Sequence, residues 1–265
     1  MYIASLGSGS KGNTFYININ GMNILIDVGL SMKKIYEKLI INIGIDIEEI
    51  DLIFITHKHD DHSKSIFTIL NKYPHIKYVM PREVYKDILK KFKKEIPKEN
   101  LVIADGGYWF KGNAIDVKPI RVNHDAINFA YKIIDKSNND SLLHLPDNGG
   151  IKTNKLKEEF TGCDYYNIES NHDLTMQIFS KRSDILKRRV LSYYGHTHNA
   201  EAIELLFQIM RENFKGVLFH HLSEECNTPE LARDTHKALI EIWGNKTQFK
   251  NTRMAYATQN DFVEL

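Results

Sequence analysis

The stretch FITHKHDDHSKS, residues 54–65, places three histidines and two aspartates within six positions, directly after an apolar run. Alternate side chains of an extended chain point the same way, so His57, His59 and Asp61 can converge as the strand ends. His62 follows where the chain turns into a helix. Imidazole nitrogens and carboxylate oxygens together suit Zn²⁺, with Mn²⁺ and Fe²⁺ as alternatives. We therefore interpret the stretch as a metal-binding loop, not a solvated turn, and side chains of different reach can serve two metals.

Length and composition are those of an ordinary globular chain. The 265 residues are 42% hydrophobic and carry a net charge of +1, so no global field draws the chain to DNA or a membrane. The two cysteines, Cys163 and Cys226, form no CxxC pair, and we interpret them as free thiols. No apolar run reaches the ~18 residues of a membrane span, and the N-terminus lacks the pattern of a signal peptide. We expect a cytoplasmic protein.

Strand and helix signals alternate along the chain, with a strand-rich middle. Asn20-Gly21 between two apolar runs indicates a hairpin, and Ser31 suits the N-cap of a helix. No repeat or linker interrupts the pattern, so we expect one domain over residues 1–265, an α/β fold of two sheets with helices outside. The predicted strands are 2–6, 14–19, 22–27, 50–56, 76–80, 101–104, 108–110, 114–120, 128–134, 141–145 and 253–258, and the predicted helices are 31–40, 64–71, 82–94 and 229–242.

Three later apolar strands are each followed by a further candidate ligand. RVNHDA supplies His124, LLHLPDNGG supplies Asp147, and GVLFHHLS supplies His221 with His220 beside it. Together with the H-x-H-x-D-H spacing, this order resembles the metallo-β-lactamase superfamily. The resemblance implies an αβ/βα four-layer sandwich of two mixed β-sheets, with helices on the outer faces and a metal site at the strand ends.

The same resemblance implies two divalent metal ions per chain, Zn²⁺ or Mn²⁺. They would be held by two sets of three residues and one bridging carboxylate: His57, His59 and His124; Asp61, His62 and His221; and Asp147 as the bridge. Lactam-hydrolysing members usually carry Cys at the bridging position, and no Cys lies near residue 147 here. Antibiotic hydrolysis is therefore not expected.

Seven stretches between residue 7 and about residue 232 resemble the YycJ/WalJ-like subfamily: GSGSKGN, ILIDVGLS, ITHKHDDH, NHDA, ESNHD, LKRRVLSYYGH and HLSEECNTPELA. This resemblance implies a metal-dependent nuclease that acts on phosphodiesters. The chain departs from the subfamily pattern at three places. It has Asn148 where the subfamily has the Thr of D-T-G, and Thr197-His198 where the subfamily has the Leu-Ser of G-H-L-S. It has Ser65 where the subfamily has Gly. None of these departures removes a metal ligand, but all lie close enough to the site to alter substrate choice.

A leaving oxygen also needs a proton, and His196 is the first candidate donor. It follows an apolar stretch, and tRNA 3′-processing nucleases of the superfamily place a His in a similar G-H-S/T context. By the same resemblance Glu169 orients that histidine, although a helix cap is the alternative. His172 and Asp61 complete the candidate catalytic residues, with a solvated side chain as the alternative for His172. Asp27 is expected to fix the metal loop or a ligand imidazole.

Other stretches leave more than one interpretation open. Backbone N–H groups at Ser8, Ser10 and Asn13 could meet a phosphate, or the loop could be a plain turn. Arg188 and Arg189 could hold a substrate phosphate or the fold. The lysines of 86–94 are expected to form a solvated surface. The aromatic residues in 107–110 are expected to be buried in a strand, with base stacking as the alternative.

Four functions compete. The first is a phosphodiesterase that cleaves DNA or RNA from an end, and the second is one for small cyclic nucleotides, which the near-zero net charge slightly favours. A metal-stabilised interaction module is the third, and an intact ligand set argues against it. A thioester or lactone hydrolase is the fourth, and the YycJ-like stretches argue against that. The expected partner is a nucleic acid or nucleotide, with no membrane, and a homodimer is left open.

Overall fold

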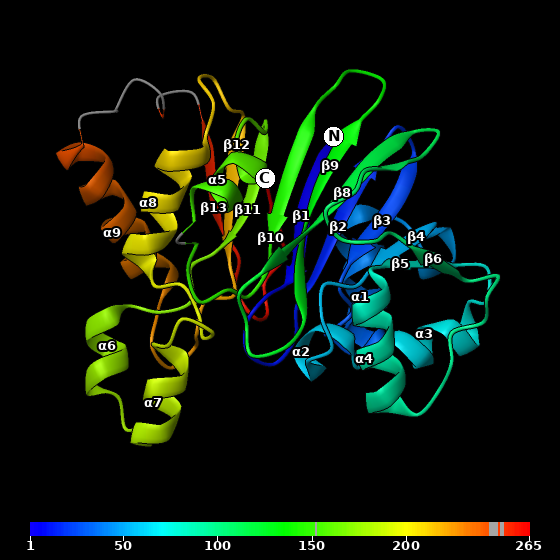
Figure 1. The fold of residues 1–265 in the computed structure, drawn as a ribbon, viewed down its shortest axis with the longest axis horizontal. Helices are drawn as coiled ribbons and strands as arrows, with labels where there is room; N and C mark the ends of the chain where they lie inside the picture. Colours follow the sequence, from blue (N-terminus) through cyan, green and yellow to red (C-terminus); the bar gives the residue numbers. More distant parts are fainter. Residues whose placement is uncertain (152, 244–248, 250–251) are drawn as a thin grey trace.

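The computed structural model describes residues 1–151, 153–243, 249 and 252–265. Its strands form two seven-stranded sheets that face each other (Figure 1). The strand order is β14-β1-β2-β3-β4-β5-β6 in the first sheet and β13-β12-β11-β10-β9-β8-β7 in the second. Strands β3 to β6 and β10 to β13 run parallel to their neighbours, and the remaining pairs are antiparallel. Both sheets are therefore mixed, as the sequence predicts.

The strands are short, as is usual for a sheet whose connections return over its face. Those of the first sheet are β1 Tyr2–Gly7, β2 Thr14–Ile19, β3 Met22–Ile26, β4 Leu52–Phe54, β5 Lys77–Met80, β6 Leu101–Ile103 and β14 Val263–Glu264. Those of the second sheet are β7 Phe110–Lys111, β8 Ile115–Val122, β9 Asn128–Asp135, β10 Ser141–Leu145, β11 Tyr165–Glu169, β12 Gly216–His220 and β13 Arg253–Tyr256.

Helices cover the outer face of each sheet (Figure 1). On the first sheet lie α1 Met32–Lys38, α3 Ile66–Lys72 and α4 Arg82–Phe92, and on the second lie α5 Asn154–Phe160, α8 Asn199–Ile209 and α9 Pro229–Ile242. Two further helices, α6 Leu174–Phe179 and α7 Asp184–Val190, project below the second sheet, and the short α2 Asp60–Ser63 follows the histidine loop. A π-turn, Leu39–Ile43, and a 3₁₀ turn, Ile47–Glu49, lead from α1 to β4.

Three buried apolar clusters fill the three spaces between these four layers. The central cluster combines residues of both sheets, such as Ile17 and Phe54 with Ile133 and Leu218. The outer clusters pack α1, α3 and α4 against the first sheet and α5, α8 and α9 against the second. The predicted four-layer sandwich is confirmed.

The parallel strands direct their C-terminal ends to one edge of the sandwich. Asp27, His57, Asp147 and His221 each lie one to three residues beyond the end of a strand. Strand β8 runs parallel to β10, because both are antiparallel to β9, so His124 reaches the same edge. Ligands gather at this edge in open α/β sheets because the loops there are free of helix packing.

The strand and helix predictions hold for most elements, with corrections at three places. The predicted strand 50–56 is shorter, since only Leu52–Phe54 pairs in the sheet. The predicted helix 64–71 begins later, as α3 at Ile66, and the separate short helix α2 precedes the predicted range. Burial of the aromatics in 107–110 is wrong: Tyr108 is 75% exposed, because β7 is an edge strand of only two residues. Among the described helices, none is long and apolar enough to cross a membrane.

Candidate metal centre

The seven predicted ligands come together at the strand-end edge, in two groups that share Asp147. In each group, one nitrogen or oxygen atom per residue lies within 4.8 Å of the others. The groups are His57, His59, His124 and Asp147, and Asp61, His62, Asp147 and His221. They are the two sets that the sequence predicts, with Asp147 common to both.

The first group is assembled from the histidine loop and the loop after β8. His124 Nε2 lies 3.2 Å from Nδ1 of His59 and 3.9 Å from Oδ2 of Asp147. His57 is fully buried and packs edge-on against His124, with ring centroids 5.2 Å apart. Three imidazoles and a carboxylate oxygen at these spacings are a donor set for a borderline transition metal such as Zn²⁺.

The second group joins the same loop to the end of β12. His62 Nε2 lies 3.3 Å from Oδ1 of Asp147, and His221 Nε2 lies 3.4 Å from Oδ2 of Asp61. His221 adopts the left-handed region with φ +58°, which is costly for a residue with a Cβ and is found mainly where surrounding structure enforces it. Its backbone N–H donates to Ser8 Oγ at 2.9 Å. The loop that carries Ser8 therefore helps to hold His221 in place.

The other ring nitrogen of each histidine is held by the protein, which fixes the ring orientation. Nδ1 of His62 lies 2.6 Å from Asp27 Oδ2, and Nδ1 of His57 lies 2.9 Å from Thr56 Oγ1. Nδ1 of His124 donates to the carbonyl of Gly195 at 3.2 Å. Asp27 therefore contacts both a candidate ligand imidazole and Thr56 of the metal loop, the two roles that were expected for it.

The chain around Asp27 is built for close approach. Asp27 itself has φ +59°, and its carboxylate accepts the N–H and the hydroxyl of Thr56 at 2.8 and 2.7 Å. Two residues on, a Cβ at Gly29 would lie 1.6 Å from the carbonyl oxygen of Asp61. Only glycine fits there, so the loop after β3 lies directly on the metal loop.

The residues present fit divalent cations on three grounds. Nε2 of His57, Nε2 of His221 and Oδ1 of Asp147 are buried without a hydrogen-bond partner in the described part of the chain. Buried polar atoms are nearly always paired, so three such atoms in one cluster indicate a ligand. The donors are nitrogen and oxygen only, which suits Zn²⁺, Mn²⁺ or Fe²⁺.

The third ground for a fit to divalent cations is the electrostatics of the buried carboxylates and imidazoles. Burial disfavours a charged imidazole, yet the charge of Asp147 and the nearby carboxylates of Asp61 and Glu169 raise the pKa of His221 to about 10. Burial would raise the pKa of Asp147, but the charges on His221 and His62 hold it well below its usual range. The buried carboxylates therefore attract compensating positive charge, and cations can supply that charge in place of protons.

Glu169 and His196 lie beside the second group. Glu169 Oε1 is 2.7 Å from Nδ1 of His196 and 2.9 Å from Nδ1 of His221. Burial would raise the pKa of Glu169, but the charge on His196 and its hydrogen bond lower it to about 2. Asp147, Glu169, His196 and His221 also have ligand atoms within 4.8 Å of one another. We do not assign a cation to them, because the hydrogen bonds to Glu169 already use the atoms that approach.

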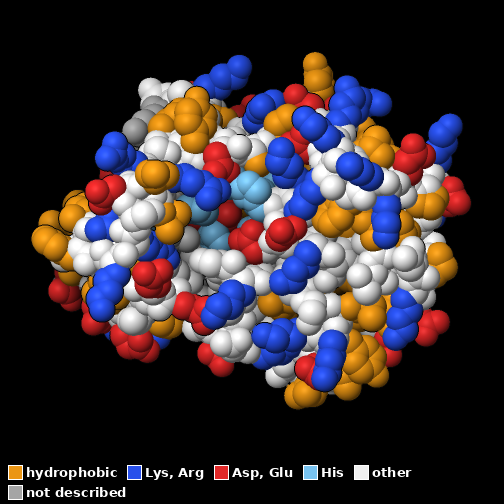
Figure 2. Space-filling view, turned by 90° about the horizontal axis from the view of Figure 1, so that it is seen from below, with side chains coloured by type: hydrophobic (Ala, Val, Ile, Leu, Met, Phe, Trp, Pro, Cys, Tyr) orange, Lys and Arg blue, Asp and Glu red, His pale blue; other side chains and the backbone are white. Residues whose placement is uncertain are grey.

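A cavity of about 430 Å³ opens over both groups. Figure 2 shows it as a hollow in which histidines lie among acidic side chains, with basic side chains around its rim. Some of the residues that line it are candidate ligands, and others come from α7 and the loops beside it. The lining residues are Ser10, His59, Asp60, Asp61, Asp147, Asn171, Arg182, Leu186, Arg189, Val190, His196 and His221. The donors that face this cavity are therefore accessible to a substrate.

His172 and the glycine-serine loop lie differently from the other candidates. His172 is fully buried and, among the described residues, is not part of the cavity lining. The phosphate interpretation of 7–13 is wrong for two of its three residues. Ser8 N–H donates to Thr258 O and Asn13 N–H to Asp61 O, so neither is available to a ligand. Ser10 does line the cavity.

Arg189 was expected to hold a substrate phosphate or the fold, whereas the role of its partner Asp125 was not foreseen. Asp125 Oδ1 lies 3.3 Å from His59 Nε2 and 3.4 Å from His124 Nε2. Its Oδ2 lies 2.6 Å from Nε of Arg189. The only signal was the adjacency of Asp125 to His124, and the contact with Arg189 joins residues 64 positions apart.

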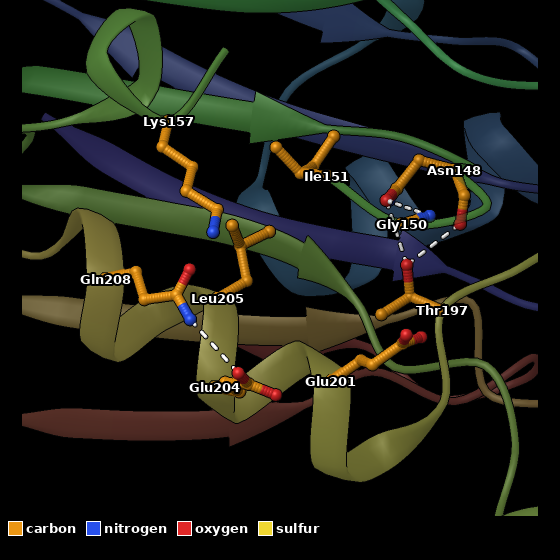
Figure 3. A pocket seen from close by; sticks show the side chains of 9 residues that line it. All are labelled: Asn148, Gly150, Ile151, Lys157, Thr197, Glu201, Glu204, Leu205 and Gln208. Atoms are coloured by element: carbon orange, nitrogen blue, oxygen red, sulfur yellow. Dashed lines mark hydrogen bonds between the residues drawn. The ribbon is translucent and has the colours of Figure 1, made fainter. Parts of the chain in front are cut away.

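A second pocket, of about 260 Å³, lies behind the site and is shown in Figure 3. Its wall includes Thr197, whose hydroxyl donates to the carbonyl of Asn148 at 2.8 Å. The N–H groups of the same two residues donate to Glu169 Oε2, at 2.9 Å from Asn148 and 3.1 Å from Thr197. Two positions at which the chain departs from the subfamily pattern thus hold the Glu169 carboxylate.

Comparison with known proteins agrees with this geometry. Residues 7–129 match the model of the metallo-beta-lactamase superfamily. The chain is 30% identical to exodeoxyribonuclease WalJ of Streptococcus pneumoniae over 87% of this chain and 84% of that protein. It is 29% identical to exodeoxyribonuclease YycJ of Bacillus anthracis over 92% of this chain and 90% of that protein. Among solved structures, the metallo-beta-lactamase fold protein YhfI from Bacillus subtilis superposes with a TM-score of 0.67 at 14% identity, over all of both chains.

Proposed function

Because this chain belongs to the metallo-β-lactamase superfamily, we propose that it is a metal-dependent nuclease that removes nucleotides from an end of DNA. Its curated relatives at about 30% identity, which it matches over most of their length, are named exodeoxyribonucleases. The observation that carries the proposal is the pair of ligand groups that share Asp147 under an open cavity. We further propose that residues 1–265 act as one domain, since the central core draws on both sheets, and that the enzyme works in the cytoplasm.

Each ligand group would hold one divalent cation, and Asp147 belongs to both groups. When bound, the two cations, Zn²⁺ or Mn²⁺, would supply a nucleophile at neutral pH and neutralise charge on the phosphoryl oxygens. Asp27 holds the His62 ring, and Glu169 holds the His221 ring, in the orientation that ligation needs. Asp61 would take part as a ligand of the second group, and it also lines the cavity in which the substrate phosphate would lie.

His196 is the proposed proton donor to the leaving oxygen. Its Nδ1 is bonded to Glu169, so Nε2 carries the proton that can be transferred. Burial alone would lower the pKa of His196, but the Glu169 and Asp147 carboxylates raise it above its usual value. A raised pKa favours the protonated ring that a general acid needs. His172 has no direct part in this scheme, because it lies outside the described cavity lining.

A small cyclic nucleotide as substrate is not favoured. The near-zero net charge that favoured it is an average over the chain, whereas basic side chains gather around the histidine hollow (Figure 2). The curated relatives are also named for action on DNA.

The test is an assay of metal-free protein, loaded with Mn²⁺ or Zn²⁺, on end-labelled DNA, the matching RNA and cyclic mononucleotides. We expect DNA to be shortened from one end, with no product when a chelator is present. Activity on cyclic nucleotides alone would overturn the proposal. The same enzyme with Asp147→Ala serves as the control for a contaminating nuclease, since it should lose all activity.

A further inference from the structure

One wall of the cavity over the metal centre is formed by residues that have no part in the proposed mechanism. Helices α6 and α7, with the turn between them, form a two-helix arm, residues 173–191, that projects beside the site (Figure 1). Arg182, Leu186 and Arg189 of the arm line the cavity. Leu186 and Arg189 are spaced i, i+3 on α7 and share one face of that helix, and Arg182 reaches the same cavity from the turn before α7. The arm therefore presents one side to the metal centre.

Hydrogen bonds hold the arm in place at two points, the turn between its helices and the C-terminal end of α7. Arg182 Nε lies 2.7 Å from Glu225 Oε2, and its NH2 group donates to Ser223 Oγ at 3.0 Å. Those partners follow His221 in the chain. At the other end, Arg189 is bonded to Asp125, which follows His124. The arm is thus tied to the two loops that carry ligands, so it has a fixed position relative to the metal centre.

The outer surface of the arm is both apolar and basic. Phe179 and Ile185 are each 82% exposed, and they flank the turn between the two helices, in which Arg182 reaches the cavity. Phe179 ends α6, and Ile185 lies in the first turn of α7. Exposed apolar side chains this close to an active-site cavity are typical of a contact surface. Figure 2 shows hydrophobic and basic side chains together on the left, beside the histidine hollow.

Charge indicates what this surface contacts. The arm has five basic and two acidic residues, a net +3, whereas the whole chain has +1, so the rest of the chain is at −2. Among the described residues, Lys181 and Arg188 are exposed and make no hydrogen bond or ion pair. Two copies of this arm, each with a net charge of +3, repel each other, whereas a polyanion is attracted to the arm. Aromatic side chains interleaved with cations are the usual platform for unpaired nucleic-acid bases.

We propose that the arm grips an unpaired strand next to the phosphate that is cleaved, with Phe179 and Ile185 against bases and Lys181 and Arg188 on phosphates. This inference rests on the proposed nuclease function. It deepens that function by naming the substrate: a single-stranded or frayed end, because bases inside a duplex are stacked and cannot reach Phe179. A blunt duplex must first open its last pairs.

The experiment compares the wild type, two arm variants and one control variant on three substrates. The variants are Phe179→Ala combined with Ile185→Ala, and Arg188→Ala; none of these residues lines the cavity. The substrates are a labelled single strand, its blunt duplex, and bis(p-nitrophenyl) phosphate, which has no base and reports on the cavity alone. A matched control combines Ile242→Ala with Lys237→Ala on α9, where Ile242 is 73% exposed and Lys237 is exposed as well.

We expect the wild type to prefer the single strand. The apolar double variant should raise the KM for the strand by about tenfold or more, as expected for the loss of base stacking. Arg188→Ala should lower the slope of log KM against log salt by about 0.7, the value for one phosphate contact on a single strand. The small ester should lose far less activity in both variants, and the control should behave as the wild type.

Each other outcome has a defined meaning. If the wild type cleaves the strand and the arm variants match it, the arm inference is overturned while the nuclease proposal stands. If the strand KM is unchanged but light scattering shows that the apolar variant has lost a dimer, the arm is a self-association surface, and the inference is again overturned. If the wild type cleaves no DNA or RNA at all, the proposed function fails, and the arm inference fails with it.

Discussion

Glu169 Oε1 lies 2.7 Å from Nδ1 of His196, and the same oxygen lies 2.9 Å from Nδ1 of His221. One buried carboxylate oxygen therefore connects the proposed proton donor to a proposed metal ligand. The second oxygen of Glu169 accepts the N–H groups of Asn148 and Thr197, so the carboxylate cannot rotate away. The proton donor is thus fixed relative to the metal centre by a group that touches both.

His196→Ala should lower kcat on DNA by about 10²–10⁴-fold, the usual contribution of a general acid. Metal content should be unchanged, because His196 belongs to neither ligand group. A p-nitrophenyl ester, whose leaving group needs no proton, should lose much less activity. His75→Ala, which removes a surface histidine bonded to Glu48 O, is the matched control. Equal losses on both substrates with the metals still bound would show that His196 is not the acid.

Asp27→Asn should weaken metal binding by about 10–100-fold, the usual effect of removing a carboxylate that orients a ligand imidazole. Asn tolerates the left-handed backbone of Asp27, so the fold should persist. Activity should return when excess metal is added, which a misfolded protein would not show. The matched control is Asp135→Asn, which alters a buried carboxylate at the end of β9 that is bonded to Asn20 and Ser137. Unchanged affinity in Asp27→Asn would contradict the orienting role.

His236 should make stability depend on pH without involving the metal centre. Burial lowers its pKa to about 3, and its ring nitrogens contact Tyr256 Oη and the Asn199 carbonyl. Between pH 6.5 and about 3 the unfolded chain binds this proton and the folded chain does not, so stability falls as the pH falls through that window. The loss is about 1.4 kcal/mol per pH unit, or about 2 kcal/mol between pH 6.5 and 5.

The measurement for His236 is urea unfolding at a series of pH values. The other buried histidines titrate too, so the informative quantity is the difference in slope between the wild type and His236→Gln. A shallower slope in the variant is expected, whatever its absolute stability. Identical slopes would mean that His236 is not neutral in the folded protein.

Much of the metal centre was predictable because each ligand follows a run of apolar residues. A strand that ends before His57, His124, Asp147 or His221 can be recognised locally, and parallel strands bring such ends to one edge. The role of Asp27 was expected from the family resemblance, which left open whether it would fix the loop or a ligand imidazole.

What could not be predicted depends on distant packing. The ion pair of Asp125 with Arg189 requires the arm to fold back over the loop after β8, and no local pattern specifies that approach. The exposure of Tyr108 depends on β7 being an edge strand, which apolar character alone does not reveal. Nor does a glycine-serine loop show in its sequence that its N–H groups donate to Thr258 and Asp61.

The central claim is that two cations share the Asp147 carboxylate, and the metal content of the protein tests it most directly. Metal-free protein is loaded with Zn²⁺ or Mn²⁺, freed of excess metal and analysed for metal and protein together. Because two ligand groups meet at Asp147, we expect two metal ions per chain. One metal ion per chain, or none, would contradict the account.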